Sequence, residues 1–162
     1  MGVFTGASSL VILHALFEQK RNHWGFDSFA GLSAPNPAFD GVAWDAGDLR
    51  ASIYVTQARL SSYNAVLQLR QGWIPNVLDD LQAEFSLRLT HIDVDLHDPT
   101  AASLDWAAKR TVAGGLIVCD DYGFASCPGA TKAVDDFLRT NAGWRLLHLT
   151  SGQGVLIAPQ DR

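Results

Sequence analysis

The sequence predicts an α/β fold with a mostly parallel sheet that ends in an antiparallel hairpin. Apolar runs of strand length alternate with segments of helical periodicity, which is typical of a parallel sheet covered by helices. Two of these runs, at 91–99 and 119–123, end in clustered aspartates. The last two runs, 144–149 and 155–159, are joined by the short turn 151–154, and so short a link requires antiparallel strands.

Length and composition indicate one globular domain that spans residues 1–162. The formal net charge of −5 provides no electrostatic footprint for nucleic acid or an anionic membrane, and no apolar run reaches the roughly 18 residues of a membrane span. The two cysteines, Cys119 and Cys127, form no C-x-x-C pattern, and no signal peptide opens the chain. We therefore expect a cytoplasmic protein that binds neither nucleic acid nor membranes.

A glycine turn opens the chain. Residues 2–8 (GVFTGAS) lead directly into an apolar-periodic helix at 9–21, and Ser8 or Ser9 is the expected helix cap. Glycines let the backbone approach a ligand closely, although glycines near a helix start are more often only turn residues. The strand that should lead into this turn is missing.

The next elements supply a candidate ribose acceptor and a candidate lid. A short strand at 23–27 ends in Asp27, where nucleotide-binding α/β folds carry an acid for the ribose hydroxyls. A solvent-exposed aspartate that caps the following turn is an equally good interpretation. Residues 33–47 show no sustained periodicity and predict a long irregular connection, a type of segment that often serves as a functional lid.

The middle of the chain predicts a helix at 48–61 begun by Asp48, a strand at 64–69 and a short helix at 77–85. Between the last two lies Trp73. This tryptophan either stacks on a flat ring or fills the core, and core packing is the commoner role for an isolated tryptophan.

Asp98 and Pro99 form a strong helix start in the second half, with the aspartate at the cap and the proline at the first helical position. This helix is expected to run to residue 112, with Gly114 and Gly115 stopping it. The other elements expected here are a strand at 88–96, a strand at 116–119 and a helix that ends at 141.

Four aspartates are expected to converge at the carboxyl ends of two adjacent strands: Asp93, Asp95, Asp120 and Asp121. If the first strand stays regular to its end, Asp93 and Asp95 share one face. Packed together, these carboxylates would raise one another's pKa unless a cation lies between them. Carboxylate oxygens suit hard divalent ions, so the pattern predicts a Mg²⁺, Mn²⁺ or Ca²⁺ site.

Six segments form a recognisable combination. They are GVFTGAS at 2–8, FDSFAGL at 26–32, QGWIPNVL at 71–78, HIDVDLHDPT at 91–100, GGLIVCDDYGFASCPGA at 114–130 and AVDDFL at 133–138. In this order they resemble the macrocin O-methyltransferase (TylF) family. The resemblance implies a Rossmann-like class I methyltransferase sandwich that uses S-adenosylmethionine and Mg²⁺ to methylate a sugar hydroxyl of a natural product or glycan.

The resemblance also implies roles for individual residues. Asp93, Asp120 and Asp121 resemble the family's metal ligands, for Mg²⁺ or alternatively Mn²⁺, and Asp95 resembles the general base. The implied partner is a sugar-bearing small molecule, and a homo-oligomer is compatible with the sequence. The implied cofactor-binding residues are Gly2, Val3, Gly6, Ser8, Asp27, Ser28, Gly72, Trp73 and Val94.

Two departures from the family bear on function. The family usually carries a tyrosine where His97 stands, and this histidine either assists proton transfer or simply packs on the loop. The family also has a first strand ahead of the glycine turn, in the middle of the sheet. We expect that strand to be missing or truncated here and cofactor affinity to be reduced; a truncated reading frame, a repacked sheet and a strand from another chain remain open.

Two other functions compete with methyl transfer. A nucleotide-sugar glycosyltransferase would use Asp93 and Asp95 as a D-x-D metal motif, but it leaves the Asp120 and Asp121 pair and the glycine turn unexplained. A catalytically impaired, methyltransferase-like binding module would explain the missing strand.

Overall fold

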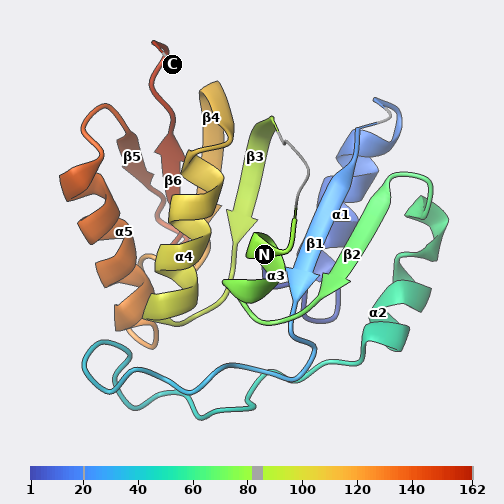
Figure 1. Ribbon diagram of the computed structural model, residues 1–162, viewed down its shortest axis with the longest axis horizontal. Coiled ribbons are helices and arrows are strands. Elements are labelled where there is room, and N and C mark those ends of the chain that lie inside the picture. Colours follow the sequence, from blue (N-terminus) through green and yellow to red (C-terminus); the bar gives the residue numbers. More distant parts are fainter. Residues whose placement is uncertain (20, 82–85, 162) are drawn as a thin grey trace.

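The computed structural model describes residues 1–19, 21–81 and 86–161. Helices and strands alternate along the chain (Figure 1). The elements are α1 Ala7–Phe17, β1 His23–Asp27, α2 Ile53–Arg59, the 3₁₀ turn η1 Ser61–Tyr63, β2 Leu67–Gln71, α3 Asn76–Asp79, β3 Leu87–Ile92, α4 His97–Ala108, β4 Thr111–Cys119, α5 Pro128–Thr140, β5 Arg145–His148 and β6 Gly154–Ile157.

The strands form two blocks. β1 pairs in parallel with β2, and the second block has the order β3-β4-β6-β5. Within it, β3 and β4 are parallel, whereas β6 is antiparallel to both β4 and β5. The predicted α/β class and the carboxyl-terminal hairpin are therefore confirmed.

Residues 1–3 lie between the two blocks. The Gly2 N–H donates to the Phe26 carbonyl at 2.9 Å, and the amino group of Met1 donates to the His91 carbonyl at 2.7 Å. The Asp93 N–H in turn donates to the Met1 carbonyl at 3.1 Å. The start of the chain thus bridges the carboxyl ends of β1 and β3, the place where the sequence predicts a truncated strand.

Helices cover both faces of the strands. α4 packs on β3 and β4, with α5 alongside it, whereas α1 lies against β1 on the opposite face (Figure 1). The main core includes Ile92, Leu104, Ile117, Val134 and Leu156, each at most 1% exposed. No helix in the described ranges is long and apolar enough to cross a membrane.

The first two helices do not begin as predicted. α1 has Gly6 at its cap, in a left-handed conformation with φ 87° and without a side-chain cap, so the prediction of Ser8 or Ser9 as the cap is wrong. α2 begins only at Ile53, behind a Ser52 cap. Asp48 instead accepts the Asp45 N–H at 2.9 Å, because its short side chain closes a local turn rather than a helix end.

Two predictions in the second half are also wrong. α4 begins at His97, ahead of the predicted Asp98 cap, and ends at Ala108. Gly114 and Gly115 do not stop this helix but lie inside β4. A Cβ on Gly115 would come within 2.7 Å of the Thr111 side chain, so close packing inside the strand explains that glycine.

The remaining boundaries shift by a few residues. β2 starts three residues later than predicted, because η1 and a turn occupy the residues before it, and β3 ends at Ile92 rather than at residue 96. α3 covers only the first part of the helix predicted at 77–85, of which residues 82–85 lie outside the described residues. Residue 20 of the helix predicted at 9–21 lies outside them as well.

The connection between β1 and α2 carries no regular secondary structure, as predicted for residues 33–47. It runs past the carboxyl ends of β1 and β3, along the edge of the molecule below these strands in Figure 1. The connection therefore lies on the edge where the aspartates end their strands.

Candidate active site

A cavity of about 150 Å³ lies at the carboxyl ends of β1 and β3. It brings together six of the nine predicted cofactor-binding residues: Gly2, Asp27, Ser28, Gly72, Trp73 and Val94. Asp93 and Asp95 line the same cavity. The glycine turn and two of the four aspartates therefore line the same cavity.

The other three predicted cofactor residues do not line this cavity. Val3 is buried, and its N–H donates to Asp27 Oδ2 at 2.7 Å. Gly6 caps α1, and a Cβ there would lie 3.2 Å from the Leu60 side chain. Ser8 is exposed and borders a different cavity. In this structure Val3 and Gly6 shape the glycine turn.

Asp27 holds the glycine turn against the end of β1. Its Oδ2 accepts the N–H groups of Val3 at 2.7 Å and Phe4 at 2.8 Å, and its Oδ1 accepts the Phe29 N–H at 2.6 Å. The bond to Phe29 fits an aspartate that caps the following turn, but Asp27 is half-buried rather than solvent-exposed. Because each carboxylate oxygen has two acceptor sites, Asp27 retains capacity on Oδ1 for a ligand hydroxyl.

Close backbone approach explains Gly2. This residue has φ 73°, and a Cβ on it would lie 1.6 Å from the Asp93 carbonyl oxygen, so only glycine fits. Across the cavity, Trp73 is 44% exposed. The core-packing interpretation of Trp73 is therefore wrong, and its ring is available to a flat ligand.

Eight residues that line the cavity were not among the predicted site residues: Phe4, Phe26, Gly31, Leu32, Ser33, Leu49, Ile74 and Pro99. Phe4 lies inside the predicted glycine turn, with φ 49°, so its position carried a signal. Ser33 begins the irregular connection predicted at 33–47, whose lid-like character pointed to the segment but not to particular residues. Leu49 was instead placed in the helix predicted at 48–61.

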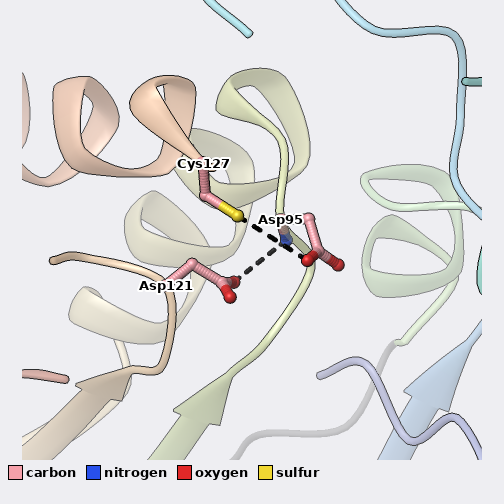
Figure 2. Close-up of side chains that lie close together, drawn as sticks. All are labelled: Asp95, Asp121 and Cys127. Atoms are coloured by element: carbon pink, nitrogen blue, oxygen red, sulfur yellow. Dashed lines mark hydrogen bonds between the residues drawn. The ribbon is translucent and has the colours of Figure 1, made fainter. Parts of the chain in front are cut away.

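The acidic residues form two overlapping groups. Oxygens of Asp93, Asp120 and Asp121 lie within 4.8 Å of one another, as do ligand atoms of Asp95, Asp121 and Cys127. Figure 2 shows the second group: Asp121 Oδ2 accepts the Asp95 N–H at 3.0 Å, and the Cys127 thiol donates to Asp95 Oδ1 at 3.8 Å. The four predicted aspartates are therefore brought together, and Cys127 joins them without having been predicted.

A turn, not strand alternation, places Asp95. β3 ends at Ile92, so the condition under which Asp93 and Asp95 would share one face of a regular strand is not met. Asp95 has φ 61°, and the Leu96 N–H donates to the Val94 carbonyl at 2.6 Å. A non-glycine residue in this region is conformationally costly, and such strain is concentrated at functional sites.

The electrostatics of the cluster favour a bound cation. Burial is the main cause that raises the pKa of Asp93, and the charge of Asp120 adds to it. Burial is also the main cause that raises the pKa of Asp95, to about 6, and the charge of Asp93 adds to it. Burial, followed by the charge of Asp95, raises the pKa of Asp121 to about 7. Within the described ranges, no lysine or arginine forms an ion pair with any of these carboxylates. A cluster of carboxylate oxygens with this deficit of positive charge fits a hard divalent metal.

Neighbouring polar side chains orient Asp120. Its Oδ1 lies 3.3 Å from His91 Nε2 and accepts from Gln153 Nε2 at 3.2 Å. Its side chain is 31% exposed, against 7% for the whole of Asp121. Hydrogen bonds of this kind fix the direction of a metal-binding carboxylate.

Asp40 ties the irregular connection to α4, which sequence reasoning also missed. It is 2% exposed, and its Oδ1 accepts the His97 N–H at 2.7 Å while Oδ2 accepts the Asn36 N–H at 2.7 Å. The His97 ring packs on Phe39, with 4.2 Å between ring centroids, and its Nδ1 lies 2.7 Å from Asp98 Oδ1. These contacts favour the packing interpretation of His97.

Comparison with known protein families gives one match over most of the chain. Residues 1–145 match the family described as Macrocin-O-methyltransferase (TylF). A curated relative from Streptomyces olivaceus, the 8-demethyl-8-(2,3-dimethoxy-alpha-L-rhamnosyl)-tetracenomycin-C 4'-O-methyltransferase, is 27% identical over 150 residues. That alignment covers 84% of this chain and 55% of the relative, so the chain spans about half the length of the relative it matches.

Solved structures share the fold. The O-methyltransferase NovP superposes with a TM-score of 0.78 at 22% identity, over 98% of this chain and 69% of that one. An SAH-bound methyltransferase of Podospora anserina, PaMTH1, superposes with a TM-score of 0.66 at 18% identity, over 99% of this chain and 70% of that one. The predicted Rossmann-like methyltransferase fold is confirmed.

Proposed function

Because the chain belongs to the macrocin O-methyltransferase (TylF) family, we propose that it methylates a sugar hydroxyl of a small molecule, using S-adenosylmethionine and a divalent metal. The observation that carries this proposal is the cavity that Gly2, Asp27 and Trp73 share with Asp93 and Asp95. A methyl donor held in that cavity would lie directly beside the acidic cluster.

The cofactor half of the cavity has the chemistry for a nucleoside. Asp27 would accept a ribose hydroxyl, and the exposed ring of Trp73 offers a stacking surface for the adenine. Gly2 lets the backbone approach the ligand. S-adenosylmethionine supplies a methyl group already activated on a sulfonium, so the chain needs no covalent nucleophile.

Asp93, Asp120 and Asp121 would hold Mg²⁺ or Mn²⁺ through carboxylate oxygens. Such an ion acts as a Lewis acid that lowers the pKa of a sugar hydroxyl. His91 and Gln153 keep Asp120 directed into the cluster. Asp121 is 7% exposed, so its side of the site would be shielded from solvent.

Asp95 would be the general base. With a pKa of about 6, its carboxylate is mostly ionised at pH 7. Because this pKa also lies close to pH 7, the carboxylate can accept a proton efficiently. It would take the proton of the sugar hydroxyl as the oxygen bonds to the methyl group and the methyl–sulfur bond breaks, which would leave S-adenosylhomocysteine. The Cys127 thiol, at 3.8 Å from Oδ1, and the turn at residues 94–96 hold its carboxylate in place.

The acceptor is proposed to be a sugar linked to a natural product. The Streptomyces olivaceus relative is named for a rhamnosyl substrate, which makes rhamnosides the first acceptors to test. The irregular connection between β1 and α2, tied to α4 by Asp40, would border the acceptor.

The test is identification of the product. The chain is incubated with methyl-labelled S-adenosylmethionine, Mg²⁺ and a panel of sugar-bearing compounds that includes rhamnosides. Mass spectrometry should find one labelled O-methyl group on a sugar. Transfer of a sugar from a nucleotide donor without methyl transfer would instead identify a glycosyltransferase, and binding of the cofactor without any product would identify a binding module.

A further inference from the structure

Three uncharged segments border the acidic cluster. They are residues 41–44 of the connection between β1 and α2, residues 122–127 between β4 and α5, and residues 149–153 between β5 and β6. None of them contains a charged side chain, and none lines the cavity proposed for the cofactor. We call these three segments together the uncharged rim.

The segments of the rim contact one another. A Cβ on Gly41 would lie 3.4 Å from Cγ of Pro128, the residue that follows the second segment. The Gly123 N–H donates to the Gly152 carbonyl at 2.7 Å. Gly152 has φ 104°, and a Cβ on it would lie 2.9 Å from the Phe124 ring, so this ring lies directly over the glycine. The rim is therefore a continuous surface.

Phe124 approaches the acidic cluster beside Asp120. The N–H of Phe124 donates to the Asp121 carbonyl at 3.2 Å, and its ring covers Gly152. The residue after this glycine, Gln153, donates to Asp120 Oδ1 at 3.2 Å. The turn that directs a proposed metal ligand therefore also supports an aromatic side chain that is 42% exposed.

Trp44 approaches the cluster beside Asp95. Burial raises the pKa of the Cys127 thiol, whereas the Ser126 and Trp44 side chains next to this thiol lower that pKa. The Cys127 thiol donates to Asp95 Oδ1 at 3.8 Å, so a single thiol separates the indole from the proposed base. Nε1 of Trp44 is buried, while part of the residue stays exposed. Trp44 and Phe124 thus reach the cluster beside two different aspartates.

The rim offers no positive charge to a ligand. Basic side chains of the neighbouring segments have partners of their own: Lys132 of α5 forms an ion pair with Asp136 at 2.7 Å, and Arg50 donates to the carbonyl of residue 30 at 3.3 Å. His148 packs edge-on against Tyr122. The carboxylates of the acidic cluster add negative charge next to the rim. The diphosphate of a nucleotide-activated sugar would stay unpaired on such a surface, whereas an uncharged apolar group meets no such cost.

We propose that the uncharged rim binds the apolar aglycone of a glycoside, with Phe124 and Trp44 as specificity-determining residues, while the sugar of that glycoside lies at the acidic cluster. This inference rests on the proposed function and narrows its acceptor to a finished glycoside rather than a nucleotide-activated sugar. The exposed ring of Phe124 supplies apolar contact area directly beside the reacting groups. The chain then acts after the class of reaction that joins the sugar to its aglycone.

The first experiment compares three acceptors at saturating S-adenosylmethionine and Mg²⁺. They are para-nitrophenyl rhamnoside, which carries an apolar aromatic aglycone, methyl rhamnoside, which carries only a methyl group there, and thymidine diphosphate rhamnose. We expect the KM of nitrophenyl rhamnoside to be at least about tenfold lower than that of either other acceptor, because only its aglycone can cover the rim. Equal KM values for the two glycosides, or a preference for the nucleotide sugar, would overturn the proposal.

Variants of the two aromatic residues locate the aglycone. Phe124→Asn removes the apolar ring, so the ratio of the KM of methyl rhamnoside to that of nitrophenyl rhamnoside should fall to about threefold or less, and Trp44→Ala should lower it as well. Phe124→Leu keeps an apolar surface and should retain most of the ratio. The matched control is Leu147→Ala, a 48% exposed apolar position on β5, which should keep the wild-type ratio. A wild-type ratio in both Phe124→Asn and Trp44→Ala would refute the role of the rim.

Direct binding separates this inference from the proposed reaction. Calorimetry of the chain with S-adenosylhomocysteine and Mg²⁺ should show saturable binding of nitrophenyl rhamnoside, which Phe124→Asn should weaken at least about fivefold. Such binding in a chain that transfers no methyl group to any acceptor would refute the proposed function while upholding the rim. Methyl transfer to a sugar, with glycoside binding that Phe124→Asn does not change, would refute the rim while upholding the proposed function.

Discussion

At the scale of single residues, Asp95 carries the proposed chemistry. It is 8% exposed, its backbone lies in the left-handed region, and its N–H donates to Asp121. The backbone strain and the bond to a second carboxylate give its side chain one direction, toward the cavity that Gly2 and Val94 also line. A buried carboxylate that forms no ion pair with a lysine or arginine costs stability, so its presence at this position favours a functional role.

Replacement of this base provides the first prediction. Asp95→Asn keeps the size of the side chain but cannot accept a proton, so kcat for methyl transfer should fall by about 10²- to 10⁴-fold. The affinity for S-adenosylhomocysteine, measured by calorimetry, should stay within a few-fold of that of the wild type. The matched control is Asp105→Asn, an exposed position on α4, which should leave both quantities unchanged. An undiminished kcat in Asp95→Asn would remove Asp95 from this role.

The proposed metal ligands provide the second prediction. Asp120→Asn removes one charged oxygen of the group it forms with Asp93 and Asp121, so affinity for Mn²⁺ should fall at least about tenfold. Electron paramagnetic resonance of free Mn²⁺ measures this directly. Asp135→Asn on α5 is the control, since Asp135 bonds to Tyr122 outside the cluster. Equal Mn²⁺ affinity in Asp120→Asn and the wild type would exclude Asp120 as a ligand.

At this scale the sequence predicted much of the site. The four aspartates, Gly2 and Trp73 lie where the motifs indicate. Cys127 and Asp40 were not predicted, because their contacts with Asp95 and His97 span 32 and 57 residues of sequence and depend on how helices pack. Local patterns carry no information about such distant contacts.

At the scale of elements, the connection between β1 and α2 depends on a single buried side chain. Asp40 accepts the first N–H of α4 and an N–H of its own segment, so it joins the connection to the helix that follows Asp95. A Cβ on Gly129 would lie 1.8 Å from Asp40 Oδ1, so the start of α5 is shaped around this carboxylate as well. One side chain thus sets the relative position of three elements.

The third prediction concerns this junction. Asp40→Asn retains one acceptor oxygen but loses the charge that suits a helix amino end, so the free energy of unfolding should fall by about 1 kcal/mol. Denaturation in urea measures this value. Asp45→Asn, an exposed position in the same connection, is the matched control and should change it by less than about 0.5 kcal/mol. Equal stability of the two variants would show that Asp40 does not hold the connection.

Element boundaries were harder to predict than elements. α5 falls where the apolar spacing of residues 133–138 places it, because a stripe of buried side chains recurs along it. Gly114 and Gly115 were assigned to a helix end, since glycine is typical there, yet both belong to β4. A two-glycine pattern suits either role, and only the packing of β4 against β3 and β6 decides between them.

At the scale of the whole molecule, buried carboxylates oppose folding when no cation is bound. The pKa of Asp121 is raised to about 7 in the folded chain, whereas an unfolded aspartate titrates near 3.8. Between these values the folded chain binds more protons than the unfolded one, so this group destabilises the fold as pH rises through that window. His23 acts in the opposite direction, because burial lowers its pKa to about 4, so the net pH profile alone does not isolate the cluster.

The fourth prediction therefore uses a difference between two proteins. In the absence of divalent metal, the stability of the wild type relative to Asp121→Asn should fall as pH rises from about 4 to about 7, by up to about 1.4 kcal/mol per pH unit. Denaturation in urea at several pH values measures the two curves. Addition of Mg²⁺ at pH 7 should stabilise the wild type more than the variant. Parallel curves would show that Asp121 is not titrating in this window.

The arrangement of the sheet was the part least accessible to sequence. Strand pairing and the terminal hairpin follow from the lengths of the connections. The spacing between β1 and β3 does not, because it depends on residues 1–3, which bond to both strands. This spacing is a property of the assembled fold.

The dependence of methyl transfer on free Mg²⁺ tests the central claim most directly. Initial rates are measured at saturating S-adenosylmethionine with an accepted sugar substrate, while free Mg²⁺ is varied in a metal buffer. The acidic cluster beside the proposed cofactor cavity predicts a rate that rises to saturation with Mg²⁺, is lost on chelation and returns when Mg²⁺ is restored. A rate that is unchanged by chelation would contradict the metal-assisted mechanism.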